Sequence, residues 1–400
     1  MIILKKNISF SPPDITMEDI DAVISVLKSG WITSGPKVKE FEENLKNYCE
    51  TDEAVTVSSA TSSMELILKV FNIGKDDEVI TTPYTYTATS SVLLHREIKP
   101  IFVDLQEGTF SMDYKKLKQQ ITENTKAIMP VDFAGFPCEY DKIKAILKEK
   151  DREDILIIVD SAHSFGAKYK GKIIGSQCDF HSFSFHAVKN LTTSEGGALV
   201  YNDKWKFKYD DLYKIFKITS LHGQTKDAFS KINSHSWEYD IVTDGFKCNM
   251  TDISAALGIS QLKRYSDILC KRKNICFKYE SLLKEKEWAI LPQLKTADGT
   301  ESSYHLYPLR IKQFDENQRN TLIKFLNEEG ISTNVHFKPL PMLTLYKNLG
   351  YNINDFPNAY NQYKNEISLP VHTKLSFEDV EFLVAKLIYY IEEIKHKNKY

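Results

Sequence analysis

The sequence predicts an α/β fold with a large domain, built on a mostly parallel seven-stranded sheet, and a smaller C-terminal α/β domain. The chain has 400 residues, and single hydrophobic cores rarely grow beyond about 300 residues. Short β-branched runs alternate with helical stretches between residues 53 and 201, as in a parallel sheet wrapped by helices. After residue 250 long helices dominate. We therefore expect domains at residues 1–249 and 250–400.

The first element expected is a helical N-terminal arm over Thr16 to Ser29. Apolar residues recur there at helical spacing, and a glycine follows as a stop signal. These residues are Ile20, Val23, Ile24, Leu27 and Gly30.

Seven short runs rich in β-branched and aromatic residues are then expected to form the strands of the sheet. The runs are Ala54 to Val57, Glu78 to Thr81, Pro100 to Asp104, Ala127 to Val131, Ile155 to Asp160, Phe180 to Phe185 and Ala198 to Tyr201.

The C-terminal domain is expected to contain long helices with a few strands between them. The helices are predicted at Thr251 to Tyr265, Lys271 to Lys284, Glu316 to Glu329 and Ser376 to Lys395, and the strands at Tyr304 to Ile311 and Ser332 to Phe337.

Composition argues against several classes of function. Lysine and arginine total 52 against 54 aspartates and glutamates, so no broad positive field attracts nucleic acid or anionic lipid. No apolar run is long enough to cross a bilayer, and no signal-peptide core is evident. The six cysteines have no zinc-ligand or Cys-x-x-Cys spacing. We expect reduced thiols, no metal site and a cytoplasmic protein.

Hydroxyl side chains crowd the start of one predicted helix. Residues 57–64 read Val-Ser-Ser-Ala-Thr-Ser-Ser-Met, so a strand leads through Thr61 and Ser62 into a helix. Ligands of open parallel sheets bind beyond the carboxyl ends of the strands, and a helix N-terminus favours an anion such as phosphate. An ordinary helix cap remains the alternative, because Ser and Thr are preferred there.

A carboxylate and a histidine follow the most apolar predicted strand. Residues 155–163 read Ile-Leu-Ile-Ile-Val-Asp-Ser-Ala-His, and a buried Asp160 needs a cationic partner or hydrogen-bond donors. The pyridinium nitrogen of pyridoxal 5'-phosphate (PLP) is such a partner. A cap of the next helix is the alternative role for Asp160.

A single lysine lies in the loop after the strand Phe180 to Phe185. Residues 183–197 read Phe-Ser-Phe-His-Ala-Val-Lys-Asn-Leu-Thr-Thr-Ser-Glu-Gly-Gly. A lysine in a tight, partly desolvated loop can act as an amine nucleophile, so Lys189 is the candidate.

The chain resembles the DegT/DnrJ/StrS family of PLP-dependent nucleotide-sugar aminotransferases. The family signature is Ser-Phe-His-x-x-Lys-Asn, followed by Thr-Thr and Glu-Gly-Gly, and residues 184–197 match it in order and spacing. Residues 30–36 (Gly-Trp-Ile-Thr-Ser-Gly-Pro), 160–163 and 249–253 also look like family motifs. Within the family, the pattern is most similar to the UDP-4-amino-4-deoxy-arabinose aminotransferase branch.

The resemblance implies PLP-dependent fold type I, like aspartate aminotransferase, and a role for each matched residue. Lys189 would bind PLP covalently, Asp160 would pair with the pyridinium nitrogen, and His163 would lie near the ring hydroxyl. The remaining implied roles are phosphate binding by Thr61, Ser62 and Ser184, stacking on the cofactor by Tyr86, and substrate-side positions for Tyr86, His186 and His336.

The resemblance also implies a homodimer with its active site at the subunit interface. Residues 244–249, Asp-Gly-Phe-Lys-Cys-Asn, match the segment that reaches the other subunit's PLP phosphate. Lys247 stands where many relatives have asparagine, and Cys248 replaces the more usual tyrosine. A lysine can still meet phosphate as a point charge.

The implied reaction moves an amino group from an amino acid, by family analogy L-glutamate, to a nucleotide-linked keto-sugar. The cofactor would pass through pyridoxamine 5'-phosphate (PMP), and the resemblance favours the 4-keto position and the synthesis of surface polysaccharide or glycan.

Three alternatives are less consistent with these residues. Some family relatives are PLP-dependent sugar dehydratases, but in one such branch a histidine replaces the lysine. A nucleotide-sugar oxidoreductase on a Rossmann-like sheet would show G-x-G-x-x-G after the first strand, which this chain lacks. A non-catalytic regulatory homologue would not need the Lys, Asp and Ser set, and no DNA-reading helix is evident.

Overall fold

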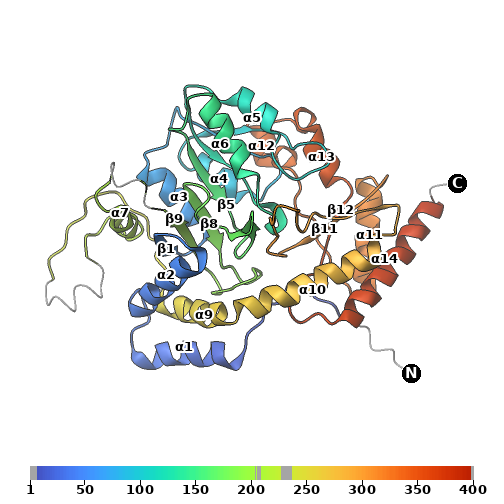
Figure 1. Ribbon diagram of the computed structural model, residues 1–400, viewed down its shortest axis with the longest axis horizontal. Helices are drawn as coiled ribbons and strands as arrows, with labels where there is room; N and C mark the ends of the chain where they lie inside the picture. Colours follow the sequence, from blue (N-terminus) through green and yellow to red (C-terminus); the bar gives the residue numbers. More distant parts are fainter. Residues whose placement is uncertain (1–6, 203, 205–208, 227–236, 398–400) are drawn as a thin grey trace.

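A seven-stranded sheet forms the centre of the larger part of the molecule (Figure 1). The computed structural model describes residues 7–202, 204, 209–226 and 237–397. The strands occur in the order β1, β9, β8, β5, β4, β2, β3, and only β9 runs antiparallel to its neighbours in this sheet. They are β1 (Glu53–Val57), β2 (Glu78–Thr81), β3 (Lys99–Phe102), β4 (Thr125–Met129), β5 (Leu156–Asp160), β8 (Phe180–Ser184) and β9 (Gly197–Tyr201). The predicted mostly parallel sheet is confirmed, and its ends shift by at most two residues.

Helices cover both faces of this sheet, which explains why β5 and β9 are buried along their whole length. One core contains apolar side chains of α2 (Pro36–Cys49), α5 (Tyr114–Gln120), α6 (Tyr140–Glu149) and α9 (Asp252–Lys263). The core on the other face contains those of α3 (Ala60–Val70), α4 (Ala88–Leu94) and α7 (Leu212–Thr219). A small hairpin pairs β6 (Lys168–Tyr169) with β7 (Lys172–Ile173).

The C-terminal part contains an antiparallel sheet of β10 (Ala289–Ile290), β11 (Tyr307–Ile311) and β12 (Glu366–Leu369). Helices α10 (Tyr265–Leu283), α11 (Glu316–Glu328) and α14 (Phe377–Lys397) contribute to its core. Short helices α12 (Thr344–Asn348) and α13 (Pro357–Tyr363) precede β12. Within the described ranges, no helix combines the length and apolar character needed to cross a membrane.

The strand predicted at Ser332 to Phe337 is wrong. Within this segment the one isolated bridge joins Asn334 to Ser368, and His336 lies in a bend. The strand that pairs with β11 is β12, further along the chain. The segment is therefore irregular, and three of its residues, Asn334, His336 and Phe337, line the cavity described below.

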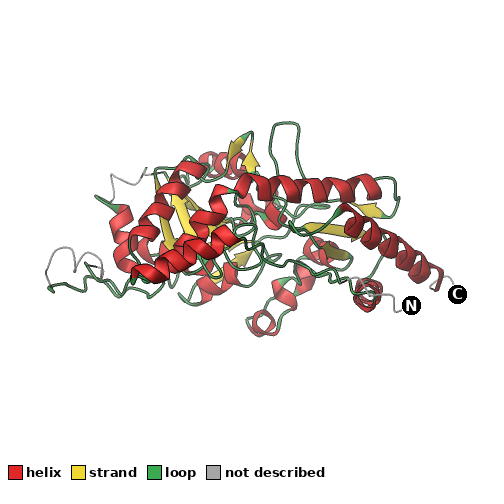
Figure 2. Cartoon of the chain, turned by 90° about the horizontal axis from the view of Figure 1, so that it is seen from below, coloured by secondary structure: helices red, strands yellow, loops and turns green. Residues whose placement is uncertain are grey.

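Helix α10 connects the two parts (Figures 1 and 2). Tyr265 and Ile268 at its start belong to the core of the large sheet, whereas Ile275, Tyr279 and Leu283 belong to the C-terminal core. Domain limits at residues 249 and 250 remain a prediction.

Helix α1 (Met17–Ser29) packs on α9 through polar groups. Thr16 and Asp19 form a capping box, and the side chains of Gln261 and Arg264 donate hydrogen bonds to Asp19. The predicted apolar residues Ile20, Ile24 and Leu27 are instead exposed. This chain therefore leaves one face of its N-terminal arm uncovered.

Candidate active site

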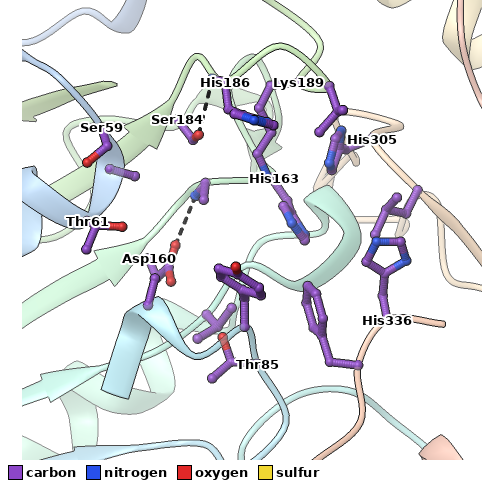
Figure 3. Close-up of a pocket in the computed structure, with 18 of the residues that line it drawn as sticks. Ser59, Thr61, Thr85, Asp160, His163, Ser184, His186, Lys189, His305 and His336 are labelled. Atoms are coloured by element: carbon purple, nitrogen blue, oxygen red, sulfur yellow. Dashed lines mark hydrogen bonds between the residues drawn. The ribbon is translucent and has the colours of Figure 1, made fainter. Parts of the chain in front are cut away.

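A cavity of about 400 Å3 lies at the carboxyl ends of β1, β5 and β8. In Figure 3, Ser59 and Thr61 lie at one end, His305 and His336 at the other, and Asp160 and His163 between them. The first end belongs to the large sheet and its helices, and the second to segments of the C-terminal part. The cavity therefore lies where parallel α/β sheets bind ligands.

The start of α3 supplies hydroxyl and amide groups at one end of the cavity. Ser59 is the N-cap and accepts a hydrogen bond from the amide of Ser62 at 3.0 Å. Thr61 and Ser184 line the cavity, but Ser62 does not; its hydroxyl lies 2.9 Å from that of Ser59 and 3.1 Å from that of Ser58. Both interpretations of the motif are therefore compatible with the structure: Ser59 caps the helix, and the helix start borders a cavity in which an anion could bind.

Gly197 permits the close approach of β9 to the start of α3. A Cβ at this position would lie 2.4 Å from the carbonyl carbon of Ser59 and 2.5 Å from the amide nitrogen of Ala60. Both are backbone atoms, so the helix start would have to move.

We expect Gly197→Ala to destabilise the protein by about 1–3 kcal/mol, the usual cost of overpacking, and to weaken PLP binding by displacing the helix start. Thermal unfolding and a PLP titration measure the two effects. Gly74→Ala is the matched control, because its Cβ would meet nothing closer than 3.5 Å. Unchanged stability and PLP affinity in Gly197→Ala would contradict this role.

Asp160 is buried at the end of β5 and is held by two donors. The Thr89 hydroxyl donates to Oδ2 at 2.6 Å. The amide of Ala162 donates to Oδ1 at 3.1 Å, the bond drawn as a dashed line at Asp160 in Figure 3. Burial raises the pKa of Asp160, while these bonds and the charge of Lys189 oppose the rise. A cation beside this carboxylate would stabilise its ionised form.

Lys189 enters the cavity from the loop between β8 and β9. Burial lowers its pKa to about 8, and the carboxylate of Asp160 opposes this decrease. An amine with this pKa loses its proton much closer to neutral pH than an ordinary lysine does, which favours a role as nucleophile or general base.

The loop that carries Lys189 is held by its neighbour, Asn190. The Asn190 side chain donates to the carbonyl of Ser303 at 2.7 Å, and its Oδ1 lies 2.9 Å from Nδ1 of His305. Buried Arg272, in the middle of α10, donates to the carbonyls of Tyr304 and His305 at 3.0 and 2.7 Å. The wall of the cavity is therefore hydrogen-bonded to both parts of the molecule.

Three histidines meet on the wall that faces Asp160. The ring of His163 lies 4.5 Å from that of His305 and 6.5 Å from that of His336. Burial lowers the pKa of all three, and the charge of Lys189 adds to the effect. They are neutral near pH 7, and among the described residues Nδ1 of His163 has no hydrogen-bond partner.

The structure brings most of the predicted site residues together. Lys189, Asp160, His163, Ser184, Thr61, Tyr86, His186 and His336 all line the cavity. Tyr86 is 62% exposed, and its ring lies 6.0 Å from that of Phe337. Lys247 does not line the cavity of its own chain; it is exposed and contacts Asn249.

Several lining or supporting residues were not predicted. Ser59, Thr85 and Phe337 line the cavity, and Thr89 supports Asp160. The hydroxyls of Thr85 and Thr89 lie 2.8 Å apart, but Thr85 precedes α4, so helical spacing did not indicate this pair. Phe337 could not be singled out, because an aromatic residue there also fits a core.

The residues present fit PLP. A buried carboxylate with room for a cation, a lysine with a lowered pKa, an unpartnered His163 nitrogen and an anion-binding helix start surround one space. In the described part of the chain, no group of three or more potential metal ligands occurs.

Comparison with known proteins gives the same assignment. Residues 13–388 match the DegT/DnrJ/EryC1/StrS aminotransferase family. Spr1654, a Streptococcus pneumoniae protein described as a sugar aminotransferase, was solved in its PMP form. Its sequence is 47% identical to this chain and its structure superposes with a TM-score of 0.93. The match covers 97% of this chain and 100% of that one. Its PLP form shares 46% identity with a TM-score of 0.92, over the same shares of the two chains.

Two curated relatives are similar over nearly their whole length. The spore coat polysaccharide biosynthesis protein SpsC of Bacillus subtilis is 37% identical over 96% of this chain and 97% of its own. The UDP-4-amino-4,6-dideoxy-N-acetyl-beta-L-altrosamine transaminase of Campylobacter jejuni is 35% identical over 97% of this chain and 98% of its own. The chain therefore belongs to the DegT/DnrJ/EryC1/StrS aminotransferase family of PLP-dependent enzymes.

Proposed function

We propose that this enzyme transfers the amino group of L-glutamate to carbon 4 of a UDP-linked 4-keto-6-deoxyhexose, in the synthesis of a surface polysaccharide or glycan. The observation that carries the reaction type is the single cavity that holds both Lys189 and Asp160. The altrosamine transaminase and SpsC support the sugar and the pathway class by similarity.

Three regions of the chain would hold the cofactor. Ser59, Thr61, Ser184 and Asp160 line the cavity; the first three would bind the phosphate, and Asp160 would pair with the ring nitrogen. When bound, PLP supplies an electron sink for the carbon that loses its proton. Asp160 would keep the ring nitrogen charged, and Lys189 would move the proton, because its lowered pKa suits a general base.

The sugar would occupy the end of the cavity nearest the C-terminal part. Phe10, His336 and Phe337 line it there, and the rings of Phe10 and His336 stack at 5.6 Å. Aromatic faces and neutral histidine nitrogens can contact a sugar ring and its hydroxyls.

A second copy of the chain would complete the site. Trp237, Tyr239, Ile241 and Val242 are exposed, on a ribbon after α7 that projects from the molecule (Figure 1). Exposed apolar groups of this kind mark interaction surfaces. Lys247 lies just beyond this ribbon and would reach the partner's phosphate, as the sequence predicts.

The experiment is a spectroscopic half-reaction with purified PLP-loaded protein. Adding L-glutamate should convert the PLP spectrum to that of PMP. Adding UDP-4-amino-4,6-dideoxy-N-acetyl-β-L-altrosamine to PLP-loaded protein should cause the same conversion, because this runs the proposed sugar half-reaction in reverse. UDP-4-amino-4-deoxy-arabinose and dTDP- and GDP-linked amino sugars complete the panel. Conversion by glutamate but by no amino sugar would overturn the substrate class, and a protein that takes up no PLP would overturn the reaction type.

A further inference from the structure

We propose that Glu366 and Ser368, which lie outside the cavity, set the tautomer of His336 and thereby decide whether its Nε2 donates or accepts a hydrogen bond with the sugar. This inference rests on the proposed function for its substrate, but its first test needs no substrate.

Three side chains form a continuous hydrogen-bonded chain from β12 to the cavity. The hydroxyl of Ser368 donates to Oε1 of Glu366 at 2.5 Å and lies 2.8 Å from Nδ1 of His336. The backbone amide of His336 donates to Oε2 of Glu366 at 3.0 Å. Glu366 and Ser368 are fully buried, so both lack water as an alternative partner.

Proton counting then links the three groups. Ionised Glu366 only accepts, so it takes the single Ser368 proton, and Ser368 accepts from a protonated Nδ1 of His336. A neutral imidazole carries one ring proton, so Nε2 is then an acceptor. If Glu366 gains a proton, it donates to Ser368, Ser368 donates to Nδ1, and Nε2 carries the proton as a donor.

Nε2 is the atom of this relay that reaches the substrate side. His336 lines the cavity, and among the described residues no protein group makes a hydrogen bond with its Nε2. The hydroxyl of Tyr84 donates to the carbonyl of His336 at 2.8 Å and holds the backbone of His336 in place. A change of tautomer therefore alters the cavity wall without moving it.

The charges around the relay permit both states. Burial raises the pKa of Glu366 to about 8, opposed by Ser368, the His336 amide and Arg319, whereas burial lowers the pKa of His336 to about 3. Nε2 is then a donor below about pH 8 and an acceptor above it.

Six titratable or charged groups face the relay from the elements packed against it. They are Arg319 from α11, Arg310 opposite Glu366 on β11, Tyr84 after β2, and His163, Lys189 and His305 across the cavity.

Glutamine at position 366 is a sharp test. Its Oε1 must accept the amide of His336, which turns its NH2 group toward Ser368. Ser368 then donates to Nδ1, and His336 is held in the Nε2-protonated form at every pH. Ser368→Ala removes the hydroxyl that connects Glu366 with Nδ1 of His336. In this variant the tautomer of His336 should no longer depend on the residue at position 366.

The measurement is 15N NMR of the PLP-loaded protein with labelled histidine, with His336→Gln identifying the signals of His336. In the wild type we expect the ring nitrogens to exchange roles between about pH 6 and 9.5, with no exchange in Glu366→Gln or Ser368→Ala. Glu366→Asp keeps the carboxylate and should restore part of the pH dependence. A wild-type tautomer that is constant over this range, or that is unaffected in both Glu366→Gln and Ser368→Ala, would overturn the relay.

The functional consequence is measured with UDP-4-amino-4,6-dideoxy-N-acetyl-β-L-altrosamine. At pH 9, we expect its KM in Glu366→Gln to differ about three- to tenfold from the wild-type value at the same pH, the effect of one hydrogen bond. An equal KM in the two proteins at pH 9 would overturn the role toward the sugar. If the wild type does not convert this compound, the substrate proposal fails while the NMR result still decides the relay.

Discussion

Replacing Lys189 by alanine is expected to abolish transamination, with a fall in turnover of at least about 10⁴-fold, the upper range for a positioned general base. Lys189 lines the cavity with Asp160, and burial brings its pKa to about 8, so the variant removes both the proposed covalent anchor and the base. Lys189→Arg should fail as well, because arginine keeps its proton.

Single-turnover spectroscopy with L-glutamate measures this loss directly. The variants should also lose the visible absorbance that PLP shows when a lysine holds it. Lys115→Ala, on the exposed surface of α5, is the control and should keep full turnover. Persistence of the visible band in Lys189→Ala would mean that another lysine is the anchor.

Asp160→Asn has the second largest expected effect, a fall in kcat of about 10²- to 5 × 10³-fold. Removing one partner of a buried ion pair typically costs about 3–5 kcal/mol, and each 1.36 kcal/mol is tenfold in rate. Asparagine keeps the size of Asp160 but cannot hold a charge on the cofactor ring nitrogen.

Thr89→Val separates charge from hydrogen bonding at the same position. It deletes only the 2.6 Å bond to Oδ2, so we expect a fall in kcat of no more than about tenfold, the effect of one hydrogen bond. Both variants should be loaded with PLP before the rates are compared. Near wild-type turnover in fully loaded Asp160→Asn would refute the assigned role.

Local pattern was sufficient to predict the large sheet and the centre of the site. The strands are short apolar runs between helices; Asp160 ends β5 and Lys189 lies in the loop that follows β8, so the order of strands places both residues near one edge of the sheet. Hydroxyls before α3 were predictable for the same reason.

Residues that reach the site from a distance were harder to predict. Strand β12 contains buried Glu366, which contradicts the apolar pattern of a buried strand, and Ser332 to Phe337 matched that pattern better without forming a strand. The contact between Asn190 and His305 joins residues 115 positions apart, which no local periodicity reports. The role of Lys247 stays a prediction, because its expected target belongs to a second copy of the chain.

The continuity of α10 restricts how the enzyme can exchange its two substrates. This helix has 19 residues, about 28 Å at 1.5 Å per residue, and a sharp bend would require a break in its hydrogen-bond ladder. Arg272, in the middle of α10, is hydrogen-bonded to the carbonyls of Tyr304 and His305 on the cavity wall that faces Asp160. A hinge motion between the two parts of the molecule would therefore have to strain this helix. We therefore expect the two proposed substrates, glutamate and the nucleotide-linked sugar, to enter a cavity of constant width, and discrimination between them to come from the residues that line it rather than from domain closure.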